Sequence, residues 1–268
     1  MGRLRLSAFI GAVMVLSPTA GALAADYSYV EVPSGHAWYL KGYFGIAWQH
    51  FDGLEHPDFS VPAYFAFTDP GHFDPAPLFG LGIGINTGTH LRFDLTGEYR
   101  TKSAFSADDE YDTLGNADPP LFDGSPGGDW GTNHYTGKKS ELLFLANGYI
   151  DIGTWHRVTP YIGAGIGASY NTISDFLDDN VPADGHGWAP TGHKWNLAWA
   201  LHAGAGIQVS DRMTLDIGYS FVNLGDAKTG NFQNVDPNIA CLTPGCPPMV
   251  FKNIYSHDLK VGIRWALN

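Results

Sequence analysis

Residues Thr159–Tyr170, with the sequence TPYIGAGIGASY, constrain the fold of this chain more than any other segment. Every second residue from Ile162 to Tyr170 is apolar or aromatic, and the residues between them are glycine or serine. A period of two predicts a β-strand, because successive side chains of a strand point to opposite faces. A strand of a soluble sheet usually carries charged residues on its wet face, whereas glycines suit a crowded, concave interior. We therefore expect a β-barrel whose apolar outer face contacts lipid.

The same alternation recurs along the chain and predicts eight strands. Their expected bounds are Trp38–Trp48, Leu78–Asn86, Leu91–Phe105, Ser140–Ile152, Thr159–Tyr170, Trp195–Val209, Met213–Phe221 and Asn253–Leu267. The connections between them alternate between long and short, and the first and last are long. An even number of strands joined in this way brings both chain ends to one side of a barrel. The sequence thus predicts an all-β fold, an eight-stranded antiparallel transmembrane β-barrel with three short periplasmic turns and four long extracellular loops.

Composition favours a membrane barrel over a soluble one. Charged residues make up only 16% of the chain, aromatic residues make up 14%, and 34 of the 268 residues are glycine. A soluble, lipocalin-like barrel of eight strands is the main alternative, but its outer face would be polar. Here the outward residues are apolar, and Trp48, Tyr99 and Trp195 lie near strand ends, where aromatic girdles meet the membrane interfaces. We expect the outer membrane of a bacterium as the location, with its lipid, its lipopolysaccharide and its assembly machinery as partners.

The first 24 residues are organised like a signal peptide. Arg3 and Arg5 form a basic start, Leu6–Leu16 is a short apolar segment, and Ala22–Ala24 is a cleavage site of the A-x-A type. The apolar segment is too short for an anchoring helix, so we expect cleavage, with residues 25–268 forming the barrel domain. Removing two arginines and no acid changes the net charge from −12 to −14, which argues against nucleic acid as a partner.

Four segments carry a family resemblance: Trp38–Gly45 (WYLKGYFG), Ala146–Thr154 (ANGYIDIGT), Thr159–Tyr170 and His257–Trp265 (HDLKVGIRW). Together they resemble the opacity-type outer-membrane β-barrels, a family similar to the transmembrane domain of outer membrane protein A. That family includes surface antigens and haemin-binding surface proteins of alphaproteobacteria. The resemblance implies the barrel fold and a role in envelope integrity, host contact or surface display, and for a few members haem uptake. Because these motifs lie in strands and turns, they specify the fold better than the activity.

Charged side chains on the expected inner face form the main candidate site. The cations are Lys41, Arg92, Arg100, Lys102, Lys260 and Arg264, and the anions are Asp94, Glu98, Asp151, Asp216 and Asp258. Side chains fill the interior of an eight-stranded barrel, and a lone buried charge is costly, so we expect these groups to pair and close the lumen. A pore selective for one sign of ion would be lined by rings of the opposite sign. A gated channel is the alternative function.

Two cysteines, Cys241 and Cys246, stand on either side of the sequence Leu-Thr-Pro-Gly. Pro244 and Gly245 favour a turn that brings the two together, and export permits oxidation. We therefore predict a local disulfide. A zinc site would need a second pair of ligands.

The long loops contain acids and histidines without a diagnostic spacing. We expect the acidic clusters at 108–112 and 175–179 to be solvated surface, because no regular loop motif spaces them for calcium. Haem iron can take histidine ligands, which leaves a haemin-binding receptor as an alternative. The histidines in or beside these loops are His50, His56, His72, His134, His186 and His193. His50 and Asp52 near a rim suggest a hydrolase, but no nucleophile–base–orienter set accompanies them.

The sequence therefore favours a non-enzymatic protein with a structural or surface-interaction role, in adhesion or envelope integrity. Its loops would meet a host or surface ligand, and we expect no catalytic residues, no metal site and no cofactor unless haem binds. A haemin-binding outer-membrane receptor is the second hypothesis, and a small porin or an envelope hydrolase is the third.

Overall fold

A computed structural model describes residues 37–60, 62, 64–112, 130–180, 185–234 and 245–267. These residues belong to one compact unit, Ser34–Asn268. The expected signal peptide and Cys241 lie outside the described residues. No helix in the described part of the chain combines the length and the hydropathy that a membrane crossing requires.

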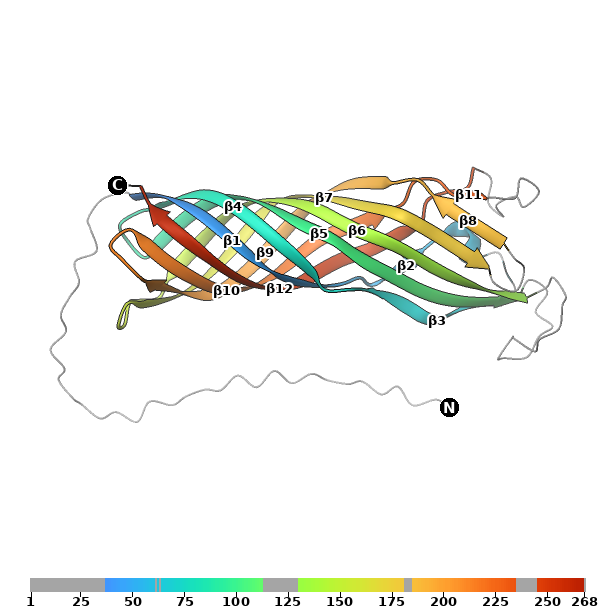
Figure 1. The fold of residues 1–268 in the computed structure, drawn as a ribbon, viewed down its shortest axis with the longest axis horizontal. Coiled ribbons are helices and arrows are strands. Elements are labelled where there is room, and N and C mark those ends of the chain that lie inside the picture. The colour runs from blue at the N-terminus through green and yellow to red at the C-terminus, as the bar shows by residue number, and fades with distance from the viewer. Residues whose placement is uncertain are drawn as a thin grey trace, which may run out of the picture. The chain divides into compact units, whose positions relative to one another are not determined.

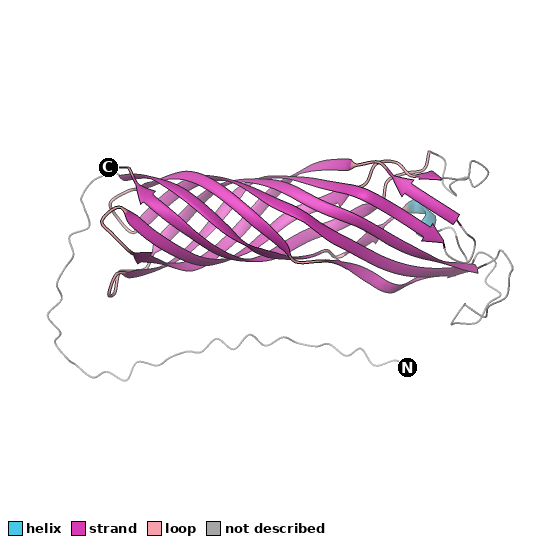
Figure 2. Ribbon diagram, viewed as in Figure 1, coloured by secondary structure: helices cyan, strands magenta, loops and turns pink. Residues whose placement is uncertain are grey.

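The described chain consists almost entirely of antiparallel strands (Figure 2). The long ones are β1 (Ala37–His50), β4 (Ala76–Asn86), β5 (Leu91–Asp112), β6 (Trp130–Asp151), β7 (Val158–Asn180), β9 (Gly192–Gln208), β10 (Met213–Lys228) and β12 (Val250–Ala266). They pair in the order β7–β6–β5–β4–β1–β12–β10–β9, and β9 pairs again with β7, which closes an eight-stranded barrel. The short elements are β2 (Gly53–Glu55), η1 (Pro57–Ser60), β3 (Tyr64–Phe73), β8 (Gly185–Ala189) and β11 (Gln233–Asn234). The predicted all-β barrel fold is confirmed.

Three short connections lie at one end of the barrel, at 87–90, 152–157 and 209–212. The start of β1 and the end of β12 lie at this same end, which we call the turn end (Figure 1). The longer connections meet at the opposite end, which we call the loop end. There β2 pairs with β12, β3 with β5, and β8 with β7.

The predicted division into two faces is confirmed along the barrel wall. Outward apolar side chains are exposed on every strand, up to 74% for Leu81 and 70% for Leu197. Inward side chains such as Arg92 and Asp258 are buried. Exposed apolar surface of this extent on all eight strands matches a lipid-facing wall.

The expected loop segments are partly wrong, because the barrel wall continues into them. β5 runs on from Phe105 to Asp112, β6 begins at Trp130 rather than Ser140, and β7 runs on from Tyr170 to Asn180. β10 and β12 also extend, to Lys228 and from Val250. Many Asp, Gly and Pro residues suggested loops, but apolar side chains still alternate there and fill the inside of the extended wall.

Two β-bulges reverse the alternation on either side of β6. The β5–β6 ladder shifts between Arg100 and Ser103, and inward positions on β5 change from even to odd numbers. The β6–β7 ladder shifts between Thr136 and Lys138, opposite Asp175, which has a φ of 54°. A bulge re-aims the side chains that follow it, so simple alternation fails beyond these points.

Candidate functional site

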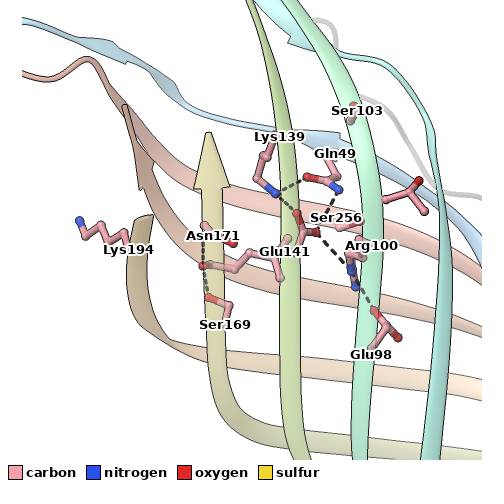
Figure 3. A network of polar contacts seen from close by, with 12 residues as sticks. Gln49, Glu98, Arg100, Ser103, Lys139, Glu141, Ser169, Asn171, Lys194 and Ser256 are labelled. Carbon is pink, nitrogen blue, oxygen red and sulfur yellow. Dashed lines mark hydrogen bonds and ion pairs between the residues drawn. The ribbon is translucent and has the colours of Figure 1, made fainter. Parts of the chain in front are cut away.

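Arg100 lies at the centre of a buried charge layer (Figure 3). Its Nη1 and Nη2 donate to the two carboxylate oxygens of Asp258 at 3.1 and 2.7 Å, and its Nε donates to Glu98 at 2.8 Å. Glu141 Oε1 lies 3.4 Å from the same Nε. Lys260 Nζ lies 2.7 Å from Glu98 and 3.2 Å from Asp258. The layer thus joins β5, β6 and β12 across the lumen by charge-assisted hydrogen bonds.

Sequence reasoning missed two members of this layer, Lys139 and Glu141, whose side chains are fully buried. Lys139 Nζ donates to Glu141 and, at 2.5 Å, to Gln49 Oε1, while Gln49 Nε2 donates to Glu141 at 3.0 Å (Figure 3). Glu141 lies on the same face of β6 as the predicted inward residue Asp151. The alternation of inward and outward residues along this strand could therefore have identified Glu141 as an inward charge. Lys139 lies in a segment that we expected to be a loop.

Lys102 is the one predicted inner cation that the structure places outside the barrel. The bulge at Arg100–Ser103 turns it outward, and its side chain is 53% exposed, with Nζ 3.2 Å from Asp175. We define the lumen network as the predicted set of inward charges, with Lys139 in place of Lys102 and with Glu141 added. Its cations are Lys41, Arg92, Arg100, Lys139, Lys260 and Arg264, and its anions are Asp94, Glu98, Glu141, Asp151, Asp216 and Asp258. Six positive charges therefore face six negative ones.

Asp94 organises a second layer, nearer the turn end. It accepts hydrogen bonds from Lys41 Nζ at 3.2 Å, from Tyr39 OH at 3.2 Å and from Asn147 Nδ2 at 2.8 Å. A ring nitrogen of His202 lies 3.0 Å from Asn147 Oδ1. A cavity of about 40 Å³ lies beside these groups, which is space for very few water molecules.

Two further ion pairs lie closer still to the turn end. Arg92 Nε lies 2.8 Å from Asp151, and its guanidinium stacks over Tyr149 at 4.8 Å from the ring centroid. Arg264 donates twice to Asp216, at 2.6 and 2.9 Å. Each charge of the lumen network therefore has an opposite charge within contact distance.

A group of aromatic rings covers the Arg100 layer on its loop-end side. We call Phe51, Phe73, Phe105, Phe176 and Phe251 the aromatic core. The ring centroids of Phe105 and Phe251 are 4.8 Å apart, and those of Phe51 and Phe73 are 5.2 Å apart. The Lys139 ammonium lies 5.7 Å from the Phe73 ring, which joins the charge layer to the aromatic core.

We expected the acidic clusters to be solvated surface, but the structure buries part of them. Asp109 points inward from β5, where its carboxylate accepts hydrogen bonds from Tyr135 OH at 2.6 Å and Asn133 Nδ2 at 3.0 Å. Burial raises the pKa of Asp109 to about 6. Burial, and then the nearby Asp109 carboxylate, raise the pKa of Asp178 to about 7. Within the described part of the chain, the buried Oδ1 of Asp178 makes no hydrogen bond. Asp108 instead points outward and is exposed.

Asp226 stabilises a further irregular region, where the β10–β12 register shifts near Gly225. Its carboxylate accepts hydrogen bonds from Lys194 Nζ at 2.6 Å, from Lys252 Nζ at 3.3 Å and from the Asn253 N–H at 2.9 Å. Burial alone would raise the pKa of Asp226, but these bonds outweigh it and hold the pKa below its ordinary value. Asp226 therefore links β9, β10 and β12 at the loop end.

Cys246 is not a free thiol, and its predicted partner Cys241 lies outside the described residues, so the pairing stays a prediction.

Several loop histidines make contacts at different places along the wall. His134 Nδ1 lies 2.6 Å from Asp108, and His186 Nδ1 lies 2.8 Å from Asp179. His50 stacks on Tyr255. Among the described residues, no group of three His, Cys, Asp or Glu side chains has a geometry suited to a metal ion.

Comparison with known proteins assigns the fold to a family. Residues 10–239 match the family model described as outer membrane protein beta-barrel domain. The chain belongs to this family. Its turn end is therefore periplasmic, its loop end is extracellular, and its exposed apolar band faces the lipid of the bacterial outer membrane. The predicted family of small outer-membrane barrels, the fold class and the location are confirmed.

The chain is similar to several proteins of this kind. A candidate adhesin of Rickettsia bellii (strain OSU 85-389) is 24% identical over 254 residues, which cover 94% of this chain and 97% of the relative. Outer membrane protein PagN of Salmonella typhimurium is 29% identical over 152 residues, which cover 55% and 58% of the two chains. Among solved structures, the outer membrane protein OprG from Pseudomonas aeruginosa has a TM-score of 0.47 at 14% identity, covering 87% of this chain and 97% of OprG.

Proposed function

We propose that this protein is a closed outer-membrane scaffold that takes part in surface interactions, with adhesion as the favoured activity. Two observations support a surface role. β5, β6 and β7 extend at the loop end to Asp112, Trp130 and Asn180, and Figure 1 shows these strands reaching far towards that end. A relative matched along nearly its whole length is named as a candidate adhesin. The proposed partner is a host or surface ligand that contacts the extracellular connections.

The lumen network is the observation that carries the closed-scaffold part of this proposal. Six cations and six anions pair within a narrow tube, and the aromatic core covers them on the extracellular side. A network without excess charge favours neither sign of ion, and the apolar rings oppose hydration. We expect no steady conductance from the purified protein in planar bilayers at moderate salt. Large, stable, ion-selective conductance would instead make a porin the better assignment.

Adhesion is tested by expressing the protein in a non-adherent Escherichia coli strain. Bacteria retained on a cultured epithelial layer are counted for the natural protein and for a variant in which residues 113–129 are replaced by a short Asn-Gly turn. The wall residues of β5 and β6 are unchanged in this variant, so we expect both proteins to keep the barrel, and heat-dependent mobility on SDS gels checks this. We expect retention to fall to the level of the empty strain. Equal retention by both, or none by the natural protein, would refute adhesion through this connection.

A further inference from the structure

Three charged side chains meet on the outside of the barrel, on adjacent strands. Lys102 on β5 and Lys138 on β6 each place Nζ 3.2 Å from Oδ2 of Asp175 on β7. All three side chains are about half exposed, at 53%, 51% and 51%. We call Lys102 and Lys138 the lysine pair.

The two bulges give this cluster its outward orientation. Between the turn end and its bulge, the even-numbered residues of β5 point inward, so Lys102 would have joined the lumen network if the strand had remained regular. Between the turn end and the other bulge, the odd-numbered residues of β7 point inward, so Asp175 would also have faced the lumen. Lys138 points outward from the regular strand between them. Each bulge gives up ladder hydrogen bonds and re-aims a charged group towards the membrane side.

The cluster lies just beyond the apolar band. The outward residue of β5 nearest the turn end is Leu91. From there towards the loop end, the first charged residue that points outward is Lys102. A strand rises about 3.3 Å per residue and tilts by about 40° in such barrels, which puts Lys102 about 28 Å above Leu91. The apolar band of an outer-membrane barrel is about 25 Å tall. The same reasoning puts Lys138 about 30 Å above Ile150 on β6. Both ammonium groups therefore lie at the level of the outer lipid headgroups.

The charges of the cluster suit an anion. Two ammonium groups share one carboxylate, which leaves one net positive charge at neutral pH, in a chain whose net charge is −12. An ammonium group has three donors, and the contact with Asp175 uses one from each lysine. The other donors are accessible from the membrane side, because both side chains are half exposed.

We propose that the lysine pair binds a phosphate group of an outer-leaflet glycolipid, the phosphorylated lipid of lipopolysaccharide. The phosphate bridges the two ammonium groups from outside, while Asp175, 3.2 Å from each Nζ, holds them together. The acyl chains of the same lipid then lie along the exposed apolar residues of β5 and β6, such as Tyr99 and Leu142. This site would give the barrel a bound lipid at a fixed position on its wall.

Native mass spectrometry of the protein in detergent tests the proposal, with bisphosphorylated lipid A and dephosphorylated lipid A as the two probes. We expect the natural protein to retain the phosphorylated lipid about tenfold better than the dephosphorylated one. The double variant Lys102→Gln/Lys138→Gln should lose this preference. Lys228→Gln, which removes an exposed lysine from β10, should keep it. Heat-dependent mobility on SDS gels checks that each variant is folded.

Asp175→Asn separates lipid binding from a purely structural contact between strands. It removes the competing carboxylate, so retention of the phosphorylated lipid should stay equal or rise. If the three residues only link β5, β6 and β7 by ion pairs, Asp175→Asn and the double lysine variant will both lower the stability of the barrel. In that case neither variant will change the preference for phosphorylated over dephosphorylated lipid A. That result would overturn the proposal, as would equal loss of preference in Lys228→Gln. Displacement of the lipid by millimolar inorganic phosphate would assign a site for free phosphate instead.

Discussion

Replacing Arg100 with methionine removes the central cation of the lumen network and keeps most of its side-chain length. Asp258, Glu98 and Glu141 all contact this guanidinium and are at most 2% exposed in their side chains. Lys139 and Lys260 would then be the remaining cations of the layer, so three carboxylates would face two ammonium groups. Removing one partner from a buried ion pair costs about 3–5 kcal/mol, because the other charge stays buried. We expect the free energy of unfolding to fall by about this amount.

Two companion variants separate charge from shape. Arg100→Met combined with Asp258→Asn restores two anions against two cations, so we expect it to recover at least half of the loss. Arg100→Lys keeps the charge but cannot make the paired bonds of 3.1 and 2.7 Å to Asp258. Its expected cost is about 2 kcal/mol, the value of a hydrogen bond between charged groups.

Reversible folding into phosphatidylcholine vesicles, followed by tryptophan fluorescence in a urea titration, measures these differences. A loss below about 0.5 kcal/mol for Arg100→Met would mean that water screens the layer, and it would refute the buried network. A double variant less stable than the single one would refute the argument from charge balance.

Four further outcomes are expected. Ile166→Arg should cost roughly 2–4 kcal/mol in the same vesicle assay if Ile166 lies near the bilayer midplane, and an unchanged urea midpoint would place it elsewhere. The raised pKa of Asp178 means that the folded state binds a proton more tightly, so stability should rise as pH falls from 8 to 5. Asp178→Asn should abolish part of that rise and be the more stable protein at pH 8. The pKa of Asp226 is lowered, so its contribution is complete near neutral pH and is lost in acid below about 4. Asp226→Asn should destabilise the barrel at pH 7 and have little effect at pH 3. Intact-mass analysis with and without reductant should show a Cys241–Cys246 disulfide, and two free thiols in the native protein would contradict it.

The membrane-spanning wall could be predicted from the sequence because lipid imposes one simple rule on it. Each outward residue must be apolar, so a period of two appears directly in Thr159–Tyr170 and in its seven counterparts. The short turns at the periplasmic end, at 87–90, 152–157 and 209–212, separate these apolar patterns clearly along the chain. These constraints are local, and a single sequence displays them.

The extracellular part obeys a weaker rule, and prediction failed there for two physical reasons. Water on the outer face accepts polar residues, so Asp108, His134 and Asp179 can occupy outward strand positions that look like loop in the sequence. Bulges also add a residue and reverse the alternation, which is why Lys102 was assigned to the wrong face. Lys139 was missed because the strand that carries it extends past the expected boundary.

The distribution of charge connects the wall to the proposed surface role. The lumen network is neutral, so the transmembrane part adds nothing to the net charge of −12. Acids gather at the extracellular end instead. They are Asp52, Glu55, Asp58, Asp69, Asp74, Asp108, Asp109, Glu110, Asp112, Asp175, Asp178, Asp179 and Asp226, against Lys102, Lys138, Lys194, Lys228 and Lys252 among the described residues.

This negative end has a consequence for any ligand that reaches it. A cationic ligand is attracted over roughly the Debye length, about 8 Å at physiological ionic strength, so its association rate should fall as salt is raised. An anionic ligand should show the opposite dependence, because salt screens the repulsion. The proposed phosphate site at the lysine pair lies on the outer wall of the barrel, on side chains that are half exposed. It is therefore separate from the acidic extracellular end, and a lipid phosphate and a cationic ligand would not compete for the same groups.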